Sequence, residues 1–338
     1  MSKSETIIFI VGNSRSGTTM MRRVLGRHPE IFMLEELHFF EQLWSSADKE
    51  KVLGVPEAAN LASKLMFIQR DGYLTEMNAE KHYEEAMNMV SAMEAAHYPH
   101  EVLRAFLHHE TKKGGRSIPC EKTPQDVFYI KEILKLFPEA RIINMVRDPR
   151  GVMLSQKRKW QRRNMGAGFM TKKEQRRLRI NYHPITISKL WNASQRAALP
   201  FVEFERVQTV IFEDLVNEGE RVVKDLCEFI GISFTPEMLQ IPQVGSSNEA
   251  DKPDSFGIKT ERAGNWEKGG LNKGEVWFCQ KICREYMESY GYSIKPVKPG
   301  IWYRLWYNLS FPFKVMLALL FNLHRMKNVG EAIRRRLR

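Results

Sequence analysis

The sequence predicts an α/β fold with a doubly wound, mostly parallel central sheet, because three short apolar runs alternate with helical segments. The runs are IIFIV at residues 7–11, RIINMV at residues 141–146, and QTVIFEDL, which we expect to form a strand to about residue 215. Short runs rich in β-branched residues are typical of strands buried on both faces of a sheet. Strands that alternate with helices indicate parallel pairing through crossover connections.

The first run leads into a glycine-bearing turn, GNSRSG at residues 12–17, and then into a helix that Thr18 and Thr19 open. A strand, a turn and a helix start in this order form a cradle of backbone N–H groups that binds anions. The common nucleotide-binding loop has Lys where this chain has Thr18, and Arg15 lies inside the turn. The sequence therefore predicts an anion site without the usual ATP apparatus.

The segments between the runs are predicted to be helical. Residues 41–116 are expected to form a helical insertion, because YEEAMNMVSAMEAA and EVLRAFLHHE have apolar residues at helical spacing. SIPCEKTP is predicted to be a short strand with a polar tip, DVFYIKEILKLF a helix that Pro138 ends, and GERVVKDLCEFIGI a helix after the third run. We expect one domain over residues 1–295 and a C-terminal helical extension over residues 296–338.

Composition narrows the class of partner and the compartment. The 338 residues carry a net charge of +12, which favours anionic partners such as nucleotide phosphates, acidic acceptors or anionic lipid. No nucleic-acid recognition motif accompanies the charge, so nucleic acid is not expected. The four cysteines are few for this length, and MSKSE runs directly into the first strand without a signal peptide. We expect free thiols in the cytoplasm, with peripheral association at the inner face of the membrane.

Polar segments follow the apolar runs or lie beside them: SRSGTT, MLEELHFF, EKTP and RDPRGVMLSQ. They are expected to meet, because parallel sheets bind ligands at the carboxyl ends of their strands. Arg147 stands where many nucleotide-hydrolysing enzymes carry a magnesium-binding Asp, and Ser155 follows it on the next predicted helix. An Arg at a strand end and a Ser on the following helix can hold a second phosphate.

Taken in order, these segments resemble those of sulfotransferases that use 3′-phosphoadenosine-5′-phosphosulfate (PAPS). NSRSGTT resembles their 5′-phosphosulfate loop, and RDPRGVMLS resembles their 3′-phosphate motif. RSGTTMMR, HPE and the pair Glu35-Glu36 resemble a run of the tyrosylprotein branch. EKTP resembles a signature of the heparan-type branch, and FEDLVNEGERVVKDLCEFIGI resembles the family's YEDL strand and following helix. The resemblance covers roughly residues 5–40, 117–160 and 185–292.

The resemblance implies which residues hold PAPS and its product, adenosine 3′,5′-bisphosphate. Arg15 is expected beside the transferring sulfuryl group. Arg147 and Ser155 are expected at the 3′-phosphate, with Lys159 assisting. The 5′-phosphosulfate is expected on the backbone amides of Ser16, Gly17, Thr18 and Thr19. Further nucleotide contacts are implied for Phe212, Ser246, Lys252 and Arg262.

The resemblance also implies the catalytic groups. Glu36 takes the place of the general base, and Lys122 that of the lysine that stabilises the bridging oxygen. Arg15 is expected to neutralise charge on the leaving phosphate together with Lys122. Burial near the like-charged Glu35 would raise the pKa of Glu36, which suits a base. Glu35 and His38 remain alternatives for that role, and the chemistry requires no metal.

Departures from the family pattern bear on the acceptor. The tyrosylprotein branch has a disulfide from the position of Cys120 to that of Met33, which cannot form here, and His38 replaces an Arg. Phe212 replaces the tyrosine of the YEDL pattern. The missing disulfide and His38 argue against a tyrosylprotein acceptor. We expect a glycan or glycolipid first, then another lipid or a small metabolite, and protein tyrosine last, with a hydroxyl ahead of an amine. The alternatives are a kinase using ATP, or a non-catalytic nucleotide-binding module recruited to a membrane.

The roles of two segments are not decided by the sequence. The basic residues 157–179 are consistent with a solvated face, with a lid or groove for an anionic acceptor, or with a membrane contact. The C-terminal segment is aromatic, then apolar, then basic, and its apolar run after Pro312 is short for a transmembrane helix. It is predicted either to lie on an anionic membrane surface or to dock on the core or on a partner subunit of a homodimer.

Overall fold

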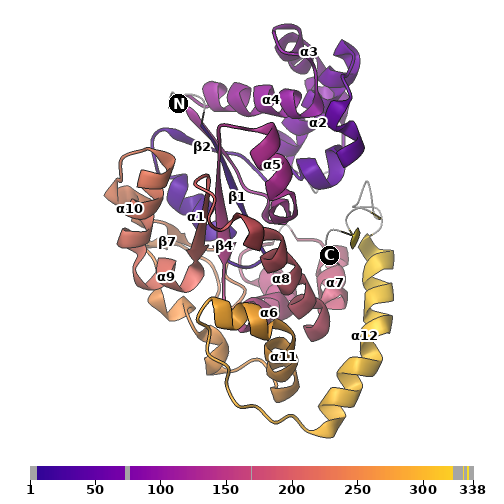
Figure 1. Ribbon diagram of the computed structural model, residues 1–338, viewed down its shortest axis with the longest axis vertical. Coiled ribbons are helices and arrows are strands. Elements are labelled where there is room, and N and C mark those ends of the chain that lie inside the picture. The colour runs from indigo at the N-terminus through magenta and orange to yellow at the C-terminus, as the bar shows by residue number, and fades with distance from the viewer. Residues whose placement is uncertain (1–5, 73–76, 169, 323–329, 331–332, 335–338) are drawn as a thin grey trace.

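A computed structural model describes residues 6–72, 77–168, 170–322, 330, 333 and 334. Its centre is a five-stranded sheet in the order β2-β3-β1-β4-β5 (Figure 1), and every pair of neighbouring strands is parallel. The strands are β1 (Ile7–Gly12), β2 (Ile31–Met33), β3 (Ile118–Glu121), β4 (Ala140–Val146) and β5 (Val207–Ile211).

Helices cover both faces of this sheet, as the predicted doubly wound fold requires. Four of them are α1 (Thr18–Leu25), α4 (Pro99–Lys113), α5 (Ile130–Leu136) and α10 (Gly219–Ile230). Figure 1 shows α1 and α10 on one side of β1 and α4 and α5 on the other. Ile8 and Ile10 of β1 pack in one core cluster with residues of α1 and α10, whereas Phe9 and Val11 pack in another with residues of α4 and α5. β1 is therefore apolar at every position because both of its faces are buried.

In the predicted insertion, residues 41–116, the described residues form three α-helices that lie at one end of the sheet (Figure 1). They are α2 (Val55–Asp71), α3 (Tyr83–Ser91) and α4. Leu65, Val90 and Phe106 from these helices belong to the same hydrophobic cluster as Phe9 of β1. The insertion is therefore packed onto the sheet through a continuous core.

The other α-helices of the described residues lie after β4. They are α6 (Pro149–Arg158), α7 (Lys172–Asn181), α8 (Pro184–Ala198), α9 (Phe212–Asn217), α11 (Lys273–Ser289) and α12 (Ile301–Asn322). A small antiparallel sheet pairs β6 (Pro242–Gln243) with β7 (Lys252–Phe256). Helix α8 packs on α6 and α11, and Trp191 of α8 is fully buried among them.

Two local predictions need correction, and one short strand was missed. The third strand ends at Ile211, not near residue 215, because Phe212 turns inward and opens α9 with Glu213 and Asp214 in its first turn. The short edge strand β2 was not predicted, since three residues are too few to show a period. The predicted helix from Asp126 begins as a 3₁₀ turn and becomes α-helical only at Ile130.

The cysteines agree with the expectation of free thiols. Cys120, Cys227, Cys279 and Cys283 are all unpaired and buried. In the register of the sheet, Met33 of β2 lies directly opposite Cys120 of β3. The position at which the tyrosylprotein branch closes a disulfide is thus occupied by an apolar contact.

The C-terminal segment forms α12, which continues through Pro312 and packs on α7, α8 and α11 (Figure 1). The predicted docking on the core is therefore observed for this helix. Among the residues that the structure describes, no helix is both long and apolar enough to cross a bilayer. Most of the predicted basic tail, residues 323–338, lies outside the described residues, as does the N-terminal segment 1–5.

Gly12, at the end of β1, is required by its backbone and its neighbours. Its φ is 139°, and an added Cβ would lie 2.4 Å from the carbonyl oxygen of Met145 in β4. Gly12→Ala is expected to lower the free energy of unfolding by about 2–4 kcal/mol, measured by urea denaturation. Gly168→Ala is the control, since nothing lies within 4 Å of that position, and it should change stability by less than about 0.5 kcal/mol. Equal losses would contradict the steric argument.

Candidate active site

The carboxyl ends of β1, β3, β4 and β5 lead into a cavity of about 830 Å³. This arrangement brings together most of the residues predicted from separate segments. Those that line the cavity are Arg15, Gly17, Thr18, Thr19, Glu36, Lys122, Arg147, Ser155, Lys159, Phe212, Ser246 and Arg262. Ser16 and Lys252 do not line it.

The turn after β1 presents the start of α1 to the cavity. Gly17 precedes the helix with a φ of 100°, and Thr18 is its first residue. The first N–H groups of a helix have no partner within the helix, so they are available to an anion. The Ser16 amide is different: it donates to the Asn13 carbonyl at 3.1 Å and thereby closes the turn. The structure thus gives Ser16 a place in the loop's own hydrogen bonding.

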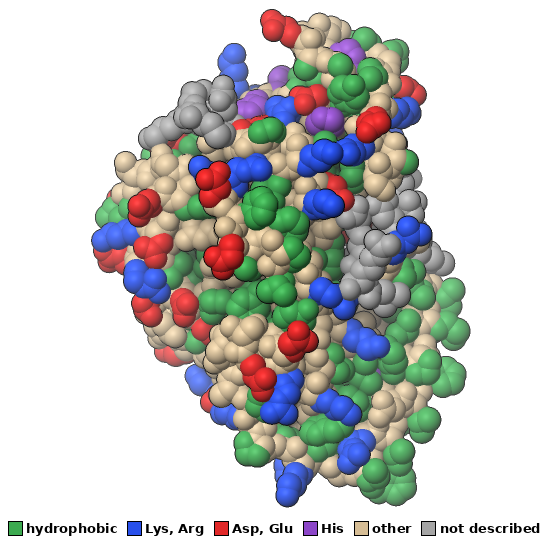
Figure 2. All heavy atoms as spheres, in the orientation of Figure 1, with side chains coloured by type: hydrophobic (Ala, Val, Ile, Leu, Met, Phe, Trp, Pro, Cys, Tyr) green, Lys and Arg blue, Asp and Glu red, His purple; other side chains and the backbone are tan. Residues whose placement is uncertain are grey.

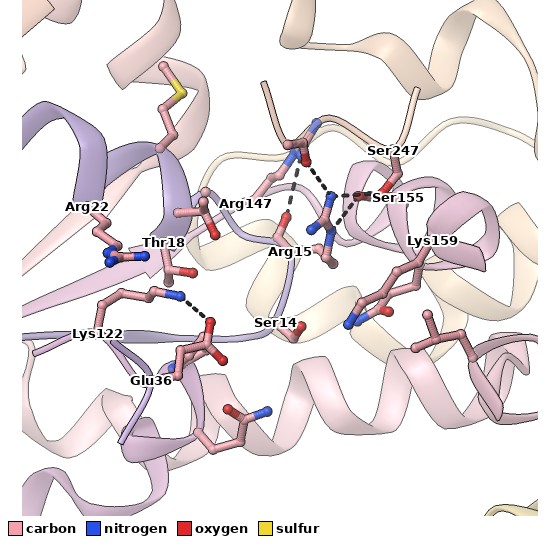
Figure 3. Close-up of a pocket in the computed structure, with 18 of the residues that line it drawn as sticks. Ser14, Arg15, Thr18, Arg22, Glu36, Lys122, Arg147, Ser155, Lys159 and Ser247 are labelled. Atoms are coloured by element: carbon pink, nitrogen blue, oxygen red, sulfur yellow. Dashed lines mark hydrogen bonds and ion pairs between the residues drawn. The ribbon is translucent and has the colours of Figure 1, made fainter. Parts of the chain in front are cut away.

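Arg15 joins this loop to two later segments. Its φ is 75°, and its Nε donates to Ser155 Oγ on α6 at 2.9 Å. Its Nη2 donates to Ser247 Oγ at 2.8 Å and to the Gly245 carbonyl at 3.2 Å (Figure 3). Burial, followed by the charge of Arg147, lowers the pKa of Arg15 to about 10. The guanidinium is therefore held rigidly in a crowded cationic environment.

Arg147 lies beside Arg15 at the end of β4. Its Nη1 is 3.4 Å from the Arg15 carbonyl oxygen, and its Nη2 donates to the Arg262 carbonyl at 3.2 Å. Its guanidinium carbon lies 4.1 Å from the centre of the Phe212 ring. That ring also fills the space next to Gly17, where a Cβ would lie 2.4 Å from Phe212 Cδ2. Phe212 therefore supports both the loop and Arg147 without needing a hydroxyl.

A third cation completes the group. Burial, with the charge of Arg15 next, lowers the pKa of Lys159 to about 8. Burial likewise lowers the pKa of Arg147. Among the described residues, the buried Nε atoms of Arg147 and Arg262 have no hydrogen-bond partner. Buried cations with unsatisfied donors are costly, so this side of the cavity is suited to an anion with several oxygens.

Glu36 and Lys122 lie together on the side of the cavity opposite this cationic group, and their side chains point toward each other (Figure 3). The Lys122 ammonium forms an ion pair with Glu36 Oε1, and His38 Nε2 lies 3.6 Å from Glu36 Oε2. The Lys122 side chain is only 3% exposed, whereas that of Glu36 is 40% exposed. A reactive hydroxyl can therefore approach Glu36 while Lys122 stays fixed beneath it.

The expected rise in the pKa of Glu36 is wrong. Burial does raise it, but the charge and hydrogen bond of Lys122, followed by His38, outweigh burial and leave the pKa below its usual value. Glu35 does not supply the expected like-charge repulsion, because its carboxylate is paired with Arg22. Glu36 is thus held ionised by Lys122, ready to accept a proton.

Buried Glu121 fixes the loop that carries Glu36. Its carboxylate accepts hydrogen bonds from the Leu37 amide at 3.3 Å and the Thr123 amide at 3.1 Å. The Thr123 hydroxyl donates to the same carboxylate, and the His38 amide donates to Thr123 Oγ1 at 3.3 Å. Residues next to Glu36 and residues next to Lys122 are therefore tied to one group.

Glu121 should make stability depend on pH. Burial raises its pKa from 4.5 to about 7, against its hydrogen bonds, which lower it. Since the folded pKa is the higher one, the stabilising contribution is complete below about pH 4.5 and is lost as the pH rises through 7. Glu121→Gln is expected to flatten the fall in unfolding free energy over this window, measured by urea denaturation at several pH values. The exposed control Glu220→Gln should keep the wild-type slope, and an unchanged slope in Glu121→Gln would contradict the argument.

The basic segment 157–179 forms part of the cavity wall. Arg162 is paired with Asp251 at 2.8 Å, and Asp251 also accepts the Gly245 amide at 2.7 Å. Farther along, Arg177 of α7 lines the cavity beside Asn322 of α12 and donates a hydrogen bond to it. Lys159 and Arg177 thus lie in the cavity wall, whereas the exposed cations of α7 are equally consistent with the solvated face and the membrane contact that the sequence left open.

Other placements differ from the sequence-based prediction or were missed. Lys252 is exposed on β7 and lies outside the cavity lining, because the antiparallel pairing of β6 and β7 holds that segment on the surface. Ser247, one residue after the predicted Ser246, makes the contact with Arg15. Asn322 carries no local motif, and only the return of α12 to α7 brings it to the cavity.

Comparison with known proteins identifies the family. The sequence model of the protein family described as "Sulfotransferase family" matches residues 8–236 of this chain. The chain belongs to the sulfotransferase family. The matched range contains the phosphate loop, Glu36, Lys122 and Arg147. The predicted family and enzyme class are thereby confirmed.

Curated relatives match this chain in sequence, and a solved structure shares its fold. Protein-tyrosine sulfotransferase 1 of Rattus norvegicus is 29% identical over 156 residues, 44% of this chain and 33% of that protein. Protein-tyrosine sulfotransferase 2 of Gallus gallus is 25% identical over 246 residues, 70% of this chain and 54% of that protein. The aligned regions thus span about a third to a half of these relatives. The sulfotransferase domain from the curacin biosynthetic pathway has the same fold, with a TM-score of 0.51 and 21% identity over 86% of this chain and 99% of that chain.

Proposed function

We propose that this sulfotransferase transfers the sulfuryl group of PAPS to a hydroxyl of a glycan, a glycolipid or another lipid. The observation that carries the proposal is one cavity with a partly buried cationic group on one side and the Glu36–Lys122 pair on the other. An anionic nucleotide and a nucleophile would therefore meet between them. The family, which uses a sulfuryl donor, supports the same reading.

The cationic side fits a nucleotide with two separate phosphate-like groups. The N–H groups at Gly17, Thr18 and Thr19 would hold the 5′-phosphosulfate at the start of α1. Arg147 and Ser155 would hold the 3′-phosphate, with Lys159 beside them. The unsatisfied Nε atoms of Arg147 and Arg262, in the part of the chain that the structure describes, support this fit. Arg15, whose Nε donates to Ser155 Oγ, would lie beside the transferring sulfuryl group.

The chemistry is an in-line displacement at sulfur. Glu36 accepts the proton of the acceptor hydroxyl as its oxygen forms a bond to sulfur. Lys122 and Arg15 stabilise the charge that develops on the phosphate oxygen as its bond to sulfur breaks. The products are the sulfated acceptor and adenosine 3′,5′-bisphosphate. Most of the catalytic effect then comes from positioning and fixed charges, as in phosphoryl transfer.

The cavity lining supports a polyhydroxylated acceptor. It contains the amide side chains Gln42, Gln125, Asn181 and Asn322 near the acidic and basic groups. Amides both donate and accept hydrogen bonds, which suits neutral hydroxyls. An amine acceptor and a small metabolite are less favoured members of the same proposal.

The test is transfer of labelled sulfate from PAPS to a panel of acceptors. The panel contains a glycan pool, glycolipids, hydroxylated lipids, small phenols and a tyrosine peptide, each tested with chelator present. Labelled product in the glycan or lipid arms would support the proposal. Label only on the peptide would contradict it. So would an absence of sulfate transfer together with phosphate transfer from ATP and magnesium in a parallel assay without chelator.

A further inference from the structure

Helix α12 has an inner side that is docked on the protein. The Tyr307 ring lies edge-on to the His183 ring, with centres 5.7 Å apart, and its hydroxyl accepts a hydrogen bond from Asn272 at 2.8 Å. The Phe311 ring lies 5.6 Å from the same His183 ring. These contacts hold α12 against α8 and α11, so its orientation is fixed by packing.

The outer side of α12 is apolar and exposed. Trp302, Trp306, Leu309 and Phe313 are 78%, 68%, 68% and 67% exposed. Their spacing of four, three and four residues places them along one stripe, which Met316 and Leu320 continue. Figure 2 shows hydrophobic side chains gathered along the edge of the molecule where Figure 1 places α12. We call these six residues the outer face.

The surroundings of the outer face are basic. The sequence from residue 289 to 322, which contains α12, has four Lys or Arg and no Asp or Glu. Helix α7, which packs against α12, presents exposed Lys172, Lys173, Arg176 and Arg179. Lys189 lies 5.2 Å from the centre of the Phe311 ring.

We propose that the outer face binds an anionic lipid bilayer, with α12 lying in the plane of the interface. Trp and Phe beside aliphatic residues suit the boundary between headgroups and acyl chains, and flanking cations are attracted to anionic lipid. A second copy of this chain fits less well, because pairing two outer faces would bring two sets of like charges together. This binding is independent of the transfer reaction proposed above.

The surface also lies beside the cavity. Asn322, at the end of α12, lines the cavity and donates a hydrogen bond to Asn181 at 3.0 Å. A bilayer on the outer face would therefore lie next to the wall that α7 and α12 share.

The experiment is co-sedimentation of the full chain with vesicles of phosphatidylcholine, alone or mixed with phosphatidylserine. The wild type should bind the anionic vesicles, with binding that weakens as salt rises. The variant Trp302→Ser/Trp306→Ser/Phe313→Ser should bind at least about tenfold less. The control Val52→Ser/Phe204→Ser removes apolar side chains that are also exposed, away from α12, and should bind as the wild type. Melting temperatures confirm that each variant is folded.

Three results would overturn the proposal. One is folded wild-type protein that does not sediment with anionic vesicles. Another is a triple variant that binds as tightly as the wild type. The third is a stable dimer in sedimentation equilibrium that the triple variant abolishes, since a second copy would then cover the outer face.

Discussion

Replacing Glu36 by Gln is expected to lower kcat by roughly a hundredfold to ten-thousandfold, because the amide cannot accept the proton of the acceptor hydroxyl. Gln keeps the size of the side chain and can still accept a hydrogen bond from Lys122. Binding of adenosine 3′,5′-bisphosphate should therefore change little. The measurement is the rate of labelled sulfate transfer under saturating PAPS, beside the bisphosphate affinity of the same protein.

Glu35→Gln is the matched comparison for that substitution. Glu35 is the adjacent carboxylate, but it is paired with Arg22. We expect kcat to fall no more than a few-fold in this variant. A large loss of kcat in Glu35→Gln with near-normal kcat in Glu36→Gln would assign the base to Glu35 instead.

Lys122→Met is expected to lower kcat by about a hundredfold to a thousandfold, because a buried cation beside the reacting groups is lost. It should also move the pH profile. Lys122 is the main group that lowers the pKa of Glu36, so its removal raises that pKa. The acidic limb of kcat/KM should then shift to higher pH, because more acid is needed in the wild type to protonate Glu36.

Lys131→Met provides the control, since Lys131 is exposed on α5. Its rate and pH profile should match the wild type. If the Lys122→Met enzyme has a reduced kcat but an unshifted acidic limb, Lys122 does not control the ionisation of Glu36, and that part of the account is wrong.

Much of the fold could be predicted because its signals are local. The run IIFIV is buried on both faces, and GNSRSG supplies the turn that leads into α1, so their positions follow from composition and spacing. The third strand was predicted too long because Phe212 is as apolar as a strand residue. It opens α9 for a tertiary reason, the space between Gly17 and Arg147, which no local pattern contains.

The candidate site also has features that the sequence could predict and features that it could not. Residues that stand in motifs, such as Arg15 and Arg147, were brought together as expected, since parallel strands end at one edge. The electrostatic surroundings of Glu36 could not be predicted, because they depend on which way side chains point. Arg22 of α1 points toward Glu35 and pairs with it, and the sequence does not show this. Ser247 was missed because it lies in an irregular loop whose position depends on the Arg162–Asp251 pair.

The most direct test of the central claim is the melting temperature of the protein with adenosine 3′,5′-bisphosphate, compared with ATP and magnesium. A ligand that binds only the folded state, at a hundred times its Kd, stabilises it by about 2.7 kcal/mol. We predict such a rise with the bisphosphate, its loss in Arg147→Ala, and its retention in Arg141→Ala at the opposite end of β4. A rise only with ATP and magnesium, or a bisphosphate effect that survives Arg147→Ala unchanged, would contradict the account.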